Sequence, residues 1–256
     1  MIVSAVSYLN TWPLVWGFLH GSQRGTFDFR FDLPALCAAA LEEGKADIGL
    51  VPCAELDRLG LDFLPDLGIA CEGAVRSILL ISRVPFSEIR TLAVDSSSRT
   101  SVALVRIILA ERYGCEPVMT RRLPNLEDMM AESDAALLIG DPALHLDPEA
   151  LRWQTLDLGA EWVEWSGLPM VFAVWAGHTV VLTEQVRSAF LGSYEWGLDR
   201  TEEMVELAVR ERGFGRELAR EYLTRHIAYR LGPNHLKGLE LFRERVRGLK
   251  PAACMV

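Results

Sequence analysis

The chain has 256 residues, half of them hydrophobic, and a formal net charge of −9. This length and composition exclude a disordered chain and allow one large core or two smaller ones. The negative charge argues against a nucleic-acid surface, which needs clustered Lys and Arg, and it means that any anion must be held by local donors against a repulsive overall field.

The first strand and the loop after it form the first candidate binding element. Residues 2–6 are apolar and partly β-branched, which predicts a strand, and Pro13 suits the start of the next helix. In open α/β sheets the polar loops at the carboxyl ends of strands carry ligand-binding groups. Asn10 lies in this loop, where it offers two donors and an acceptor to a ligand. The alternative, a turn residue that bonds its own backbone, is equally compatible with the sequence.

Strands and helices then alternate, which is typical of a parallel sheet. Periodicity predicts helices at 33–45 and around 53–58, and strands at 27–31, 46–52, 67–71 and 73–82. Arg76 and Ser77 stand where a polar loop enters the last of these strands. Residues 83–89 have the composition of a linker between two bodies.

The stretch from Thr91 to Tyr113 contains the strongest candidate for an anion site. A short apolar strand leads into Asp95-Ser96-Ser97-Ser98-Arg99-Thr100-Ser101, and an apolar repeat at helical spacing follows. The first turn of a helix has unpaired backbone N–H groups and a positive dipole end, which bind anions. Ser98, Thr100 and Ser101 add hydroxyl donors, and Arg99 adds a fork suited to a carboxylate or phosphate.

Two other interpretations of this turn remain open. Ser98 or Thr100 is an ordinary N-cap in the first, although a cap needs one such residue and this turn has five hydroxyl residues and an arginine. In the second, Arg99 points outward and pairs with Asp95.

The next candidate loop follows a buried strand at 135–139. Gly140 allows a ligand to approach the backbone closely, and Asp141 either accepts from a ligand hydroxyl or caps the helix after Pro142, which we slightly favour. A helix at 123–132 with Asn125 as its cap precedes this strand. Beyond it the pattern predicts a long apolar strand at 170–176 and helices at 183–197, 201–212, 215–226 and 233–249.

This order of elements indicates an α/β protein with two bodies and a hinge. We expect the first body to comprise residues 1–85 and 177–256, and the inserted second body residues 86–176, with crossings near 82–90 and 172–178. The loops after residues 6, 94 and 139 and before residue 78 would then converge on one cleft, and clefts between domains are common ligand sites.

Most familiar catalytic and metal-binding patterns are missing. The chain has no GxSxG, GxxxxGK[ST], HExxH or GxGxxG motif, and its five cysteines and five histidines lack the spacing of metal ligands. We therefore expect reduced core thiols, no metal and no cofactor. No apolar run approaches the roughly 18 residues of a membrane span, and no secretion leader is evident. We expect a cytoplasmic monomer or homodimer that contacts neither membrane nor nucleic acid.

Several stretches, taken together, resemble the chorismate dehydratases of the futalosine route to menaquinone. They are Ser7-Tyr8-Leu9-Asn10 with Pro13-Leu14, Ala46-Asp47-Ile48-Gly49-Leu50-Val51-Pro52, Ser96-Ser97-Ser98-Arg99-Thr100-Ser101, Leu138-Ile139-Gly140-Asp141, and Gly167-Leu168-Pro169-Met170-Val171-Phe172-Ala173-Val174-Trp175. The resemblance covers the chain from the first strand to Trp175 and is less distinctive in the terminal helices. It departs from the expected pattern at Asp95, where a small residue is usual and where a carboxylate facing the cleft would weaken anion binding.

The resemblance implies a type II periplasmic-binding-protein fold and the dehydration of chorismate to 3-[(1-carboxyvinyl)oxy]benzoate. It assigns substrate positioning and charge stabilisation to Asn10 and Ser77, and it places a substrate carboxylate on the turn from Ser98 to Ser101. It also implies that the substrate's own side-chain carboxylate accepts the proton, which fits the lack of an evident base.

Two related functions are the main alternatives. A non-catalytic solute-binding protein for a small carboxylate shares the fold but would need a secretion signal. The 1,4-dihydroxy-6-naphthoate synthase of the same pathway would be expected to place a histidine in the cleft, and His145 is the nearest candidate. The effector domain of a transcription regulator is less compatible with the sequence, because such a domain would be expected to carry an attached helix-turn-helix.

Overall fold

The computed structural model describes residues 1–250 and 254–255. Its strands are β1 (Ile2–Val6), β2 (Asp28–Asp32), β3 (Ile48–Pro52), β4 (Asp62–Cys71), β5 (Ile78–Ser82), β6 (Thr91–Asp95), β7 (Val118–Arg122), β8 (Ala135–Ile139), β9 (Gln154–Asp157), β10 (Met170–Gly177), β11 (Ala228–Arg230) and β12 (Cys254–Met255). Its α-helices are α1 (Trp12–His20), α2 (Pro34–Glu42), α3 (Leu56–Leu59), α4 (Thr100–Arg112), α5 (Leu126–Glu132), α6 (Gly140–Leu144), α7 (Leu158–Ser166), α8 (Glu184–Leu198), α9 (Thr201–Arg212), α10 (Arg216–Glu221) and α11 (Pro233–Gly248).

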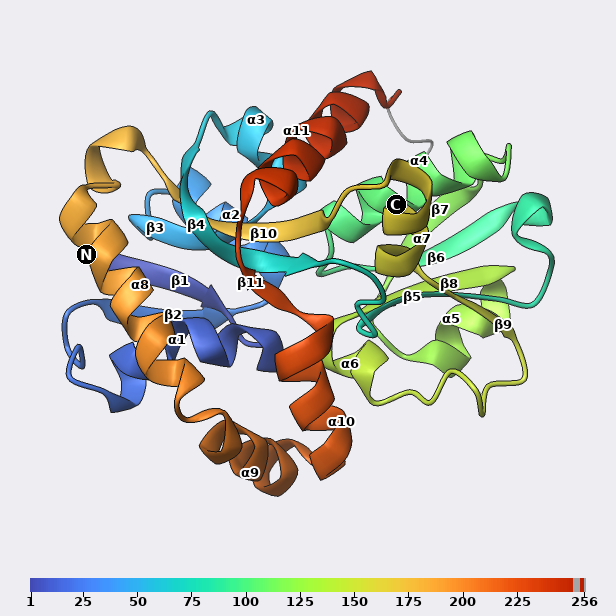
Figure 1. Cartoon of the computed structure of the whole chain (residues 1–256). Helices are drawn as coiled ribbons and strands as arrows, with labels where there is room; N and C mark the ends of the chain where they lie inside the picture. Colours follow the sequence, from blue (N-terminus) through green and yellow to red (C-terminus); the bar gives the residue numbers. More distant parts are fainter. Residues whose placement is uncertain (251–253, 256) are drawn as a thin grey trace.

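These strands form two six-stranded sheets that lie side by side (Figure 1). The first has the order β11-β4-β10-β3-β1-β2 and the second the order β12-β7-β6-β8-β5-β9. The predicted parallel pairing is present among β1, β2 and β3 and among β6, β7 and β8. The strands at the crossings, β4, β5, β9 and β10, pair antiparallel, so both sheets are mixed.

The chain passes from one sheet to the other at different positions from those that the sequence predicts. Strand β5 was expected in the first body but pairs with β8 and β9 of the second sheet, and β10 was expected in the second body but pairs with β3 and β4 of the first. The backbone of β12 also pairs with the second sheet. Both β5 and β10 are apolar and almost fully buried, and such strands fit either sheet equally well by composition. The predicted boundaries at 85/86 and 176/177 therefore do not coincide with the change of sheet.

Most predicted helices are present within a few residues of their expected bounds. Helix α5 has Asn125 as its cap, and the Asn125 side chain accepts from the Asp128 amide at 3.2 Å, as the capping pattern predicts. The predicted helix at 215–226 is α10 followed by one π-helical segment, η5 (Tyr222–His226). Strands β7 and β11 were not predicted, because β7 carries exposed charges and β11 is only three residues long.

The terminal helices pack mainly on the first body, and α11 also contacts the second. Helix α8 packs on α1, α11 packs on both β10 and α4, and η5 contacts the short helix η1 (Leu9–Thr11) that contains Asn10. In Figure 1 the helices α9 and α10 lie along the lower edge of the molecule, and Arg212 at the end of α9 pairs with Asp141 of α6. No helix in the described part of the chain is long and apolar enough to cross a membrane.

Candidate active site

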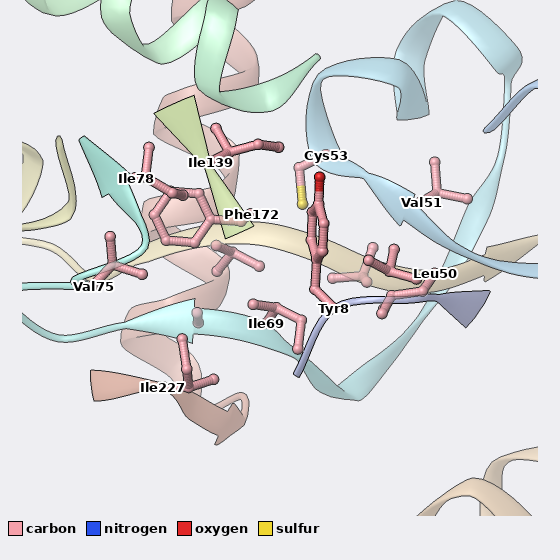
Figure 2. Close-up of a cluster of buried hydrophobic side chains, with 14 of the residues drawn as sticks. Tyr8, Leu50, Val51, Cys53, Ile69, Val75, Ile78, Ile139, Phe172 and Ile227 are labelled. Atoms are coloured by element: carbon pink, nitrogen blue, oxygen red, sulfur yellow. The ribbon is translucent and has the colours of Figure 1, made fainter. Parts of the chain in front are cut away.

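The four predicted loops line one cavity between the two sheets. Apolar side chains from both sheets form its walls, and Figure 2 shows several of them around the ring of Tyr8. Seven of the eight predicted site residues line it, namely Asn10, Ser77, Ser98, Arg99, Thr100, Ser101 and Gly140. The predicted convergence of the loops is therefore confirmed, whereas the role of each residue stays a prediction.

The serine-rich turn presents the N-terminus of α4 to the cavity. Arg99 is the N-cap residue and makes no side-chain cap hydrogen bond, so neither Ser98 nor Thr100 is the cap. The Thr100 hydroxyl donates to the Phe172 carbonyl at 2.9 Å, which commits its proton to a contact between the bodies. Within the described residues no hydrogen bond engages the hydroxyls of Ser98 and Ser101. These two hydroxyls and the helix end are therefore the donors available to an anion.

Arg99 adds positive charge at this end of the cavity. The Arg99 side chain is 30% exposed, and its guanidinium lies 3.8 Å from the carboxylate of Glu55. It forms no pair with Asp95, so the outward-pairing alternative is wrong. Burial lowers the pKa of Arg99, and the nearby Arg121 lowers it further. A bound anion would raise the pKa of Arg99 again, since its negative charge would lie closer to the guanidinium than that of Glu55 does.

Asp95 lies behind the turn and does not line the cavity. It is 1% exposed, and its Oδ1 accepts from the Ser97 amide at 2.9 Å and the Ser97 hydroxyl at 2.7 Å. Burial raises the pKa of Asp95 above its ordinary value. The concern that this carboxylate repels an anion from the cleft is thus removed by geometry. Asp95 instead braces the turn that carries the predicted ligand donors.

Tyr8 and Gly140 both line the cavity and fit closely against each other. The Tyr8 hydroxyl shares a 3.1 Å hydrogen bond with Ser97, and burial raises the pKa of Tyr8 to about 12. Gly140 has a φ of 61°, and a Cβ there would lie 2.4 Å from the Tyr8 ring. Glycine is therefore required at this position for two reasons, backbone conformation and space. The predicted close approach to Gly140 is made by Tyr8 itself.

Asn10 and Ser77 are joined by a buried tyrosine, Tyr222, that no motif in the sequence marks. The Asn10 Nδ2 donates to the Tyr222 hydroxyl at 3.0 Å, and that hydroxyl donates to the Ser77 Oγ at 2.8 Å. Tyr222 is fully buried, and burial raises its pKa well above the ordinary value. The two residues that the resemblance assigns to catalysis are thus held by one phenol from the C-terminal segment.

A strained loop presents Ser77. Arg76 has a φ of 67°, the only positive value among the described non-glycine residues, and such a conformation costs about 1–3 kcal/mol. Asp157 compensates by accepting from the amides of Val75 at 3.0 Å and Arg76 at 2.6 Å. The same carboxylate caps α7. Asp157 before a helix is a recognisable cap in the sequence, but its second role depends on a loop about 80 residues away.

Asp141 is the predicted site residue that does not line the cavity. One of its oxygens accepts from the Leu9 amide at 2.9 Å, and the other pairs with the guanidinium of Arg212. It does not cap α6 either, since that helix has Ile139 at its N-cap and no side-chain cap. The interpretation of Asp141 as a helix cap is therefore wrong, because its partners come from distant parts of the chain, and a contact with a ligand stays a prediction. It connects the second sheet to the first and to α9.

The cavity contains no side chain that accepts a proton readily. Its lining includes no His, Asp, Glu or Lys among the described residues, and its ionisable groups are Tyr8 and Arg99. His145, the histidine nearest to a predicted cleft loop, stacks on Phe214 with ring centroids 4.1 Å apart and is not a lining residue. Within the described part of the chain, no cluster of His, Cys, Asp and Glu is arranged to hold a metal ion. The site offers hydrogen-bond donors, the positive charge of Arg99 and apolar walls.

The sequence also matches a known family along most of its length. The model of a family described as menaquinone biosynthesis matches residues 1–248. The chain belongs to this menaquinone biosynthesis family. Within the family, it is similar to the chorismate dehydratase of Thermus thermophilus, to which it is 31% identical over 236 residues, 83% of this chain and 84% of the relative.

Solved structures support the same architecture for this family member. The chain is similar to protein AF1704 from Archaeoglobus fulgidus, with a TM-score of 0.78, 15% identity and 96% of each chain covered. It is also similar to the periplasmic aliphatic sulphonate binding protein of Escherichia coli, with a TM-score of 0.65, 12% identity, and 96% of this chain and 85% of that one covered. These identities establish the fold alone, which is periplasmic-binding-protein-like, and this confirms the fold that the sequence resemblance implies.

Proposed function

We propose that this protein is a chorismate dehydratase that converts chorismate to 3-[(1-carboxyvinyl)oxy]benzoate and water, in the futalosine route to menaquinone and in the cytoplasm. The observation that carries the proposal is a cavity lined by anion donors, by Asn10 and by Ser77, with no general base among the described residues of its lining. The likeness to the Thermus thermophilus enzyme supports the choice of substrate.

The chemistry suits such a site. The C–H bond beside the enol ether and the neighbouring C–O bond break, a ring double bond forms, and the ring becomes aromatic. The protein must supply orientation, exclusion of water and fixed donors, because aromatisation provides the driving force. A cavity without a base is compatible with proton transfer to the substrate's own side-chain carboxylate.

We assign carboxylate binding and positioning of the reacting atoms to different residues of the cavity. The N-terminus of α4, with Ser98, Ser101 and Arg99, would hold a substrate carboxylate. Asn10 and Ser77 would position the reacting carbon and the departing hydroxyl and stabilise charge there. The two rivals lack a comparable observation: no histidine lines the described cavity, and the binding-protein likeness concerns the fold alone.

The test is to incubate the purified protein with chorismate and follow the product by mass spectrometry, with Asn10→Ala beside the wild type. We expect loss of one water by the wild type and a loss of activity in Asn10→Ala. Asn125→Ala is the matched control, because it removes an asparagine that only caps α5. Intact chorismate with the wild-type protein would refute the proposal, and the later acids of the pathway and other small carboxylates would then be screened.

A further inference from the structure

Tyr222 connects the two residues to which catalysis is assigned, yet it does not line the cavity. Its side chain is fully buried, and it enters from η5, a π-helical segment of the C-terminal region. Single π-helical turns inside helical segments are rare and are found frequently at functional sites. Since its hydroxyl lies beside the ligand space without facing it, Tyr222 acts on a ligand only through Asn10 and Ser77.

The hydrogen bonds of Tyr222 fix the direction of donors in the site. A neutral phenol has one proton, and burial keeps Tyr222 neutral by raising its pKa. That proton is donated to Ser77 Oγ, so the bond from Asn10 must use the amide Nδ2 as donor. Ser77 is therefore left with its own hydroxyl proton to donate elsewhere, and Asn10 with its Oδ1 and one further N–H.

We propose that Tyr222 is a positioning residue for the dehydration, which sets Ser77 as a hydrogen-bond donor to the departing hydroxyl and holds the Asn10 amide in its productive orientation. The inference rests on the proposed function for the identity of the reaction. The departing oxygen leaves with the electron pair of its C–O bond, so a donor already aimed at it stabilises the developing charge. Without Tyr222, Ser77 and Asn10 can each rotate and must be reordered for every turnover.

The variant Tyr222→Phe tests this role, because it removes only the hydroxyl and keeps the ring. Misplacement of catalytic groups costs on the order of 100-fold, so we expect kcat to fall by about 10- to 100-fold. We expect the KM for chorismate to change by less than about threefold, since the carboxylate donors at α4 are untouched. When Tyr222→Phe is added to Asn10→Ala or Ser77→Ala, we expect little further loss of kcat. The reason is that the first substitution has already removed one member of the hydrogen-bonded set of Asn10, Tyr222 and Ser77.

Tyr229→Phe is the matched control. Tyr229 is also buried, lies in β11, and its hydroxyl has no hydrogen-bond partner among the described residues. We expect wild-type kcat and KM for this variant. A kcat for Tyr222→Phe within about twofold of wild type, or equal effects of the two variants, would overturn the inference.

A crystal structure of each protein separates this inference from the proposed function. In Tyr222→Phe we expect the Asn10 amide or the Ser77 side chain to adopt a different rotamer from the wild type, and in Tyr229→Phe both to be unchanged. If the wild type fails to dehydrate chorismate, the proposed function is refuted. If both side chains keep their positions in Tyr222→Phe, the positioning role is refuted, whatever the activity assay gives.

Discussion

Asp141 and Arg212 form an ion pair between the second sheet and the end of α9. The Arg212 guanidinium also donates to the Ser7 carbonyl at 2.7 Å, and the other Asp141 oxygen accepts from the Leu9 amide. Both side chains are largely buried, with Arg212 27% exposed and Asp141 13% exposed. This pair therefore ties the first loop, the loop after β8 and the terminal helices together beside the cavity.

Replacing Asp141 tests the value of this connection. We expect Asp141→Asn to lower the free energy of unfolding by about 1–3 kcal/mol. The reason is that the partly buried carboxylate loses its charge, which weakens its interactions with the Arg212 guanidinium and the Leu9 amide. Urea unfolding measures the effect. Glu132→Gln is the control, since Glu132 pairs with Arg122 at the exposed surface, and we expect a change below about 0.5 kcal/mol. If the two variants lowered the free energy of unfolding equally, the ion pair of Asp141 would contribute no more to stability than an exposed surface pair.

Gly140 and Gly114 allow the contact with Tyr8 to be separated from backbone strain. Both have positive φ, 61° and 68°, but a Cβ at Gly114 would meet nothing within 4 Å. We expect Gly114→Ala to cost about 1–2 kcal/mol from backbone conformation alone, and Gly140→Ala to cost about 1–3 kcal/mol more because Tyr8 must move. Urea unfolding of both variants checks this. A similar cost at the two positions would contradict the steric argument.

Arg99 provides a test of the carboxylate site. We expect Arg99→Gln to raise the KM for chorismate by about 10- to 100-fold, the value of one lost charged hydrogen bond, with a smaller change in kcat. Arg121→Gln is the control, because Arg121 lies near Arg99 but is not a lining residue. Steady-state kinetics separate the two parameters. An unchanged KM in Arg99→Gln would place the substrate carboxylate elsewhere.

Asp95 predicts a dependence of stability on pH. Burial raises its pKa above 3.8, so the folded protein holds this proton to higher pH than the unfolded chain does. Its contribution to stability is complete below 3.8 and is lost as the pH rises through the raised pKa. We therefore expect the unfolding free energy of wild type minus that of Asp95→Asn to fall as the pH rises from about 4 to about 8.

Asp134→Asn gives the opposite sign and serves as the control. Burial would raise the pKa of Asp134, but hydrogen bonds from Arg90 and Thr91 outweigh it and lower the pKa below 3.8. The contribution of Asp134 is present above 3.8 and is lost at lower pH. Unfolding free energies measured across the pH range should show the two opposite trends. A difference for Asp95→Asn that rises with pH would contradict this direction, because it would show that the folded protein stabilises the ionised form of Asp95.

Much of the candidate site was predictable because its parts are local. Each loop follows or precedes an apolar strand, and the carboxyl ends of parallel strands share one edge of a sheet, so their convergence followed from the order of elements. Tyr222 was not predictable in this way. It lies 145 residues from Ser77, and the helical pattern around it indicates only that it faces a core.

The sequence by itself determined most of the helices and strands, and where several of them begin. Hydrophobic periodicity and caps such as Asn125 act within a few residues, so they carry that information without the rest of the fold. Only the tertiary structure decided that β5 and β10 belong to the opposite sheets from those expected, and that Asp141 pairs with Arg212. Strand pairing and distant ion pairs depend on which surfaces meet in space, and a buried apolar strand or a lone carboxylate is compatible with many partners until the whole chain has packed.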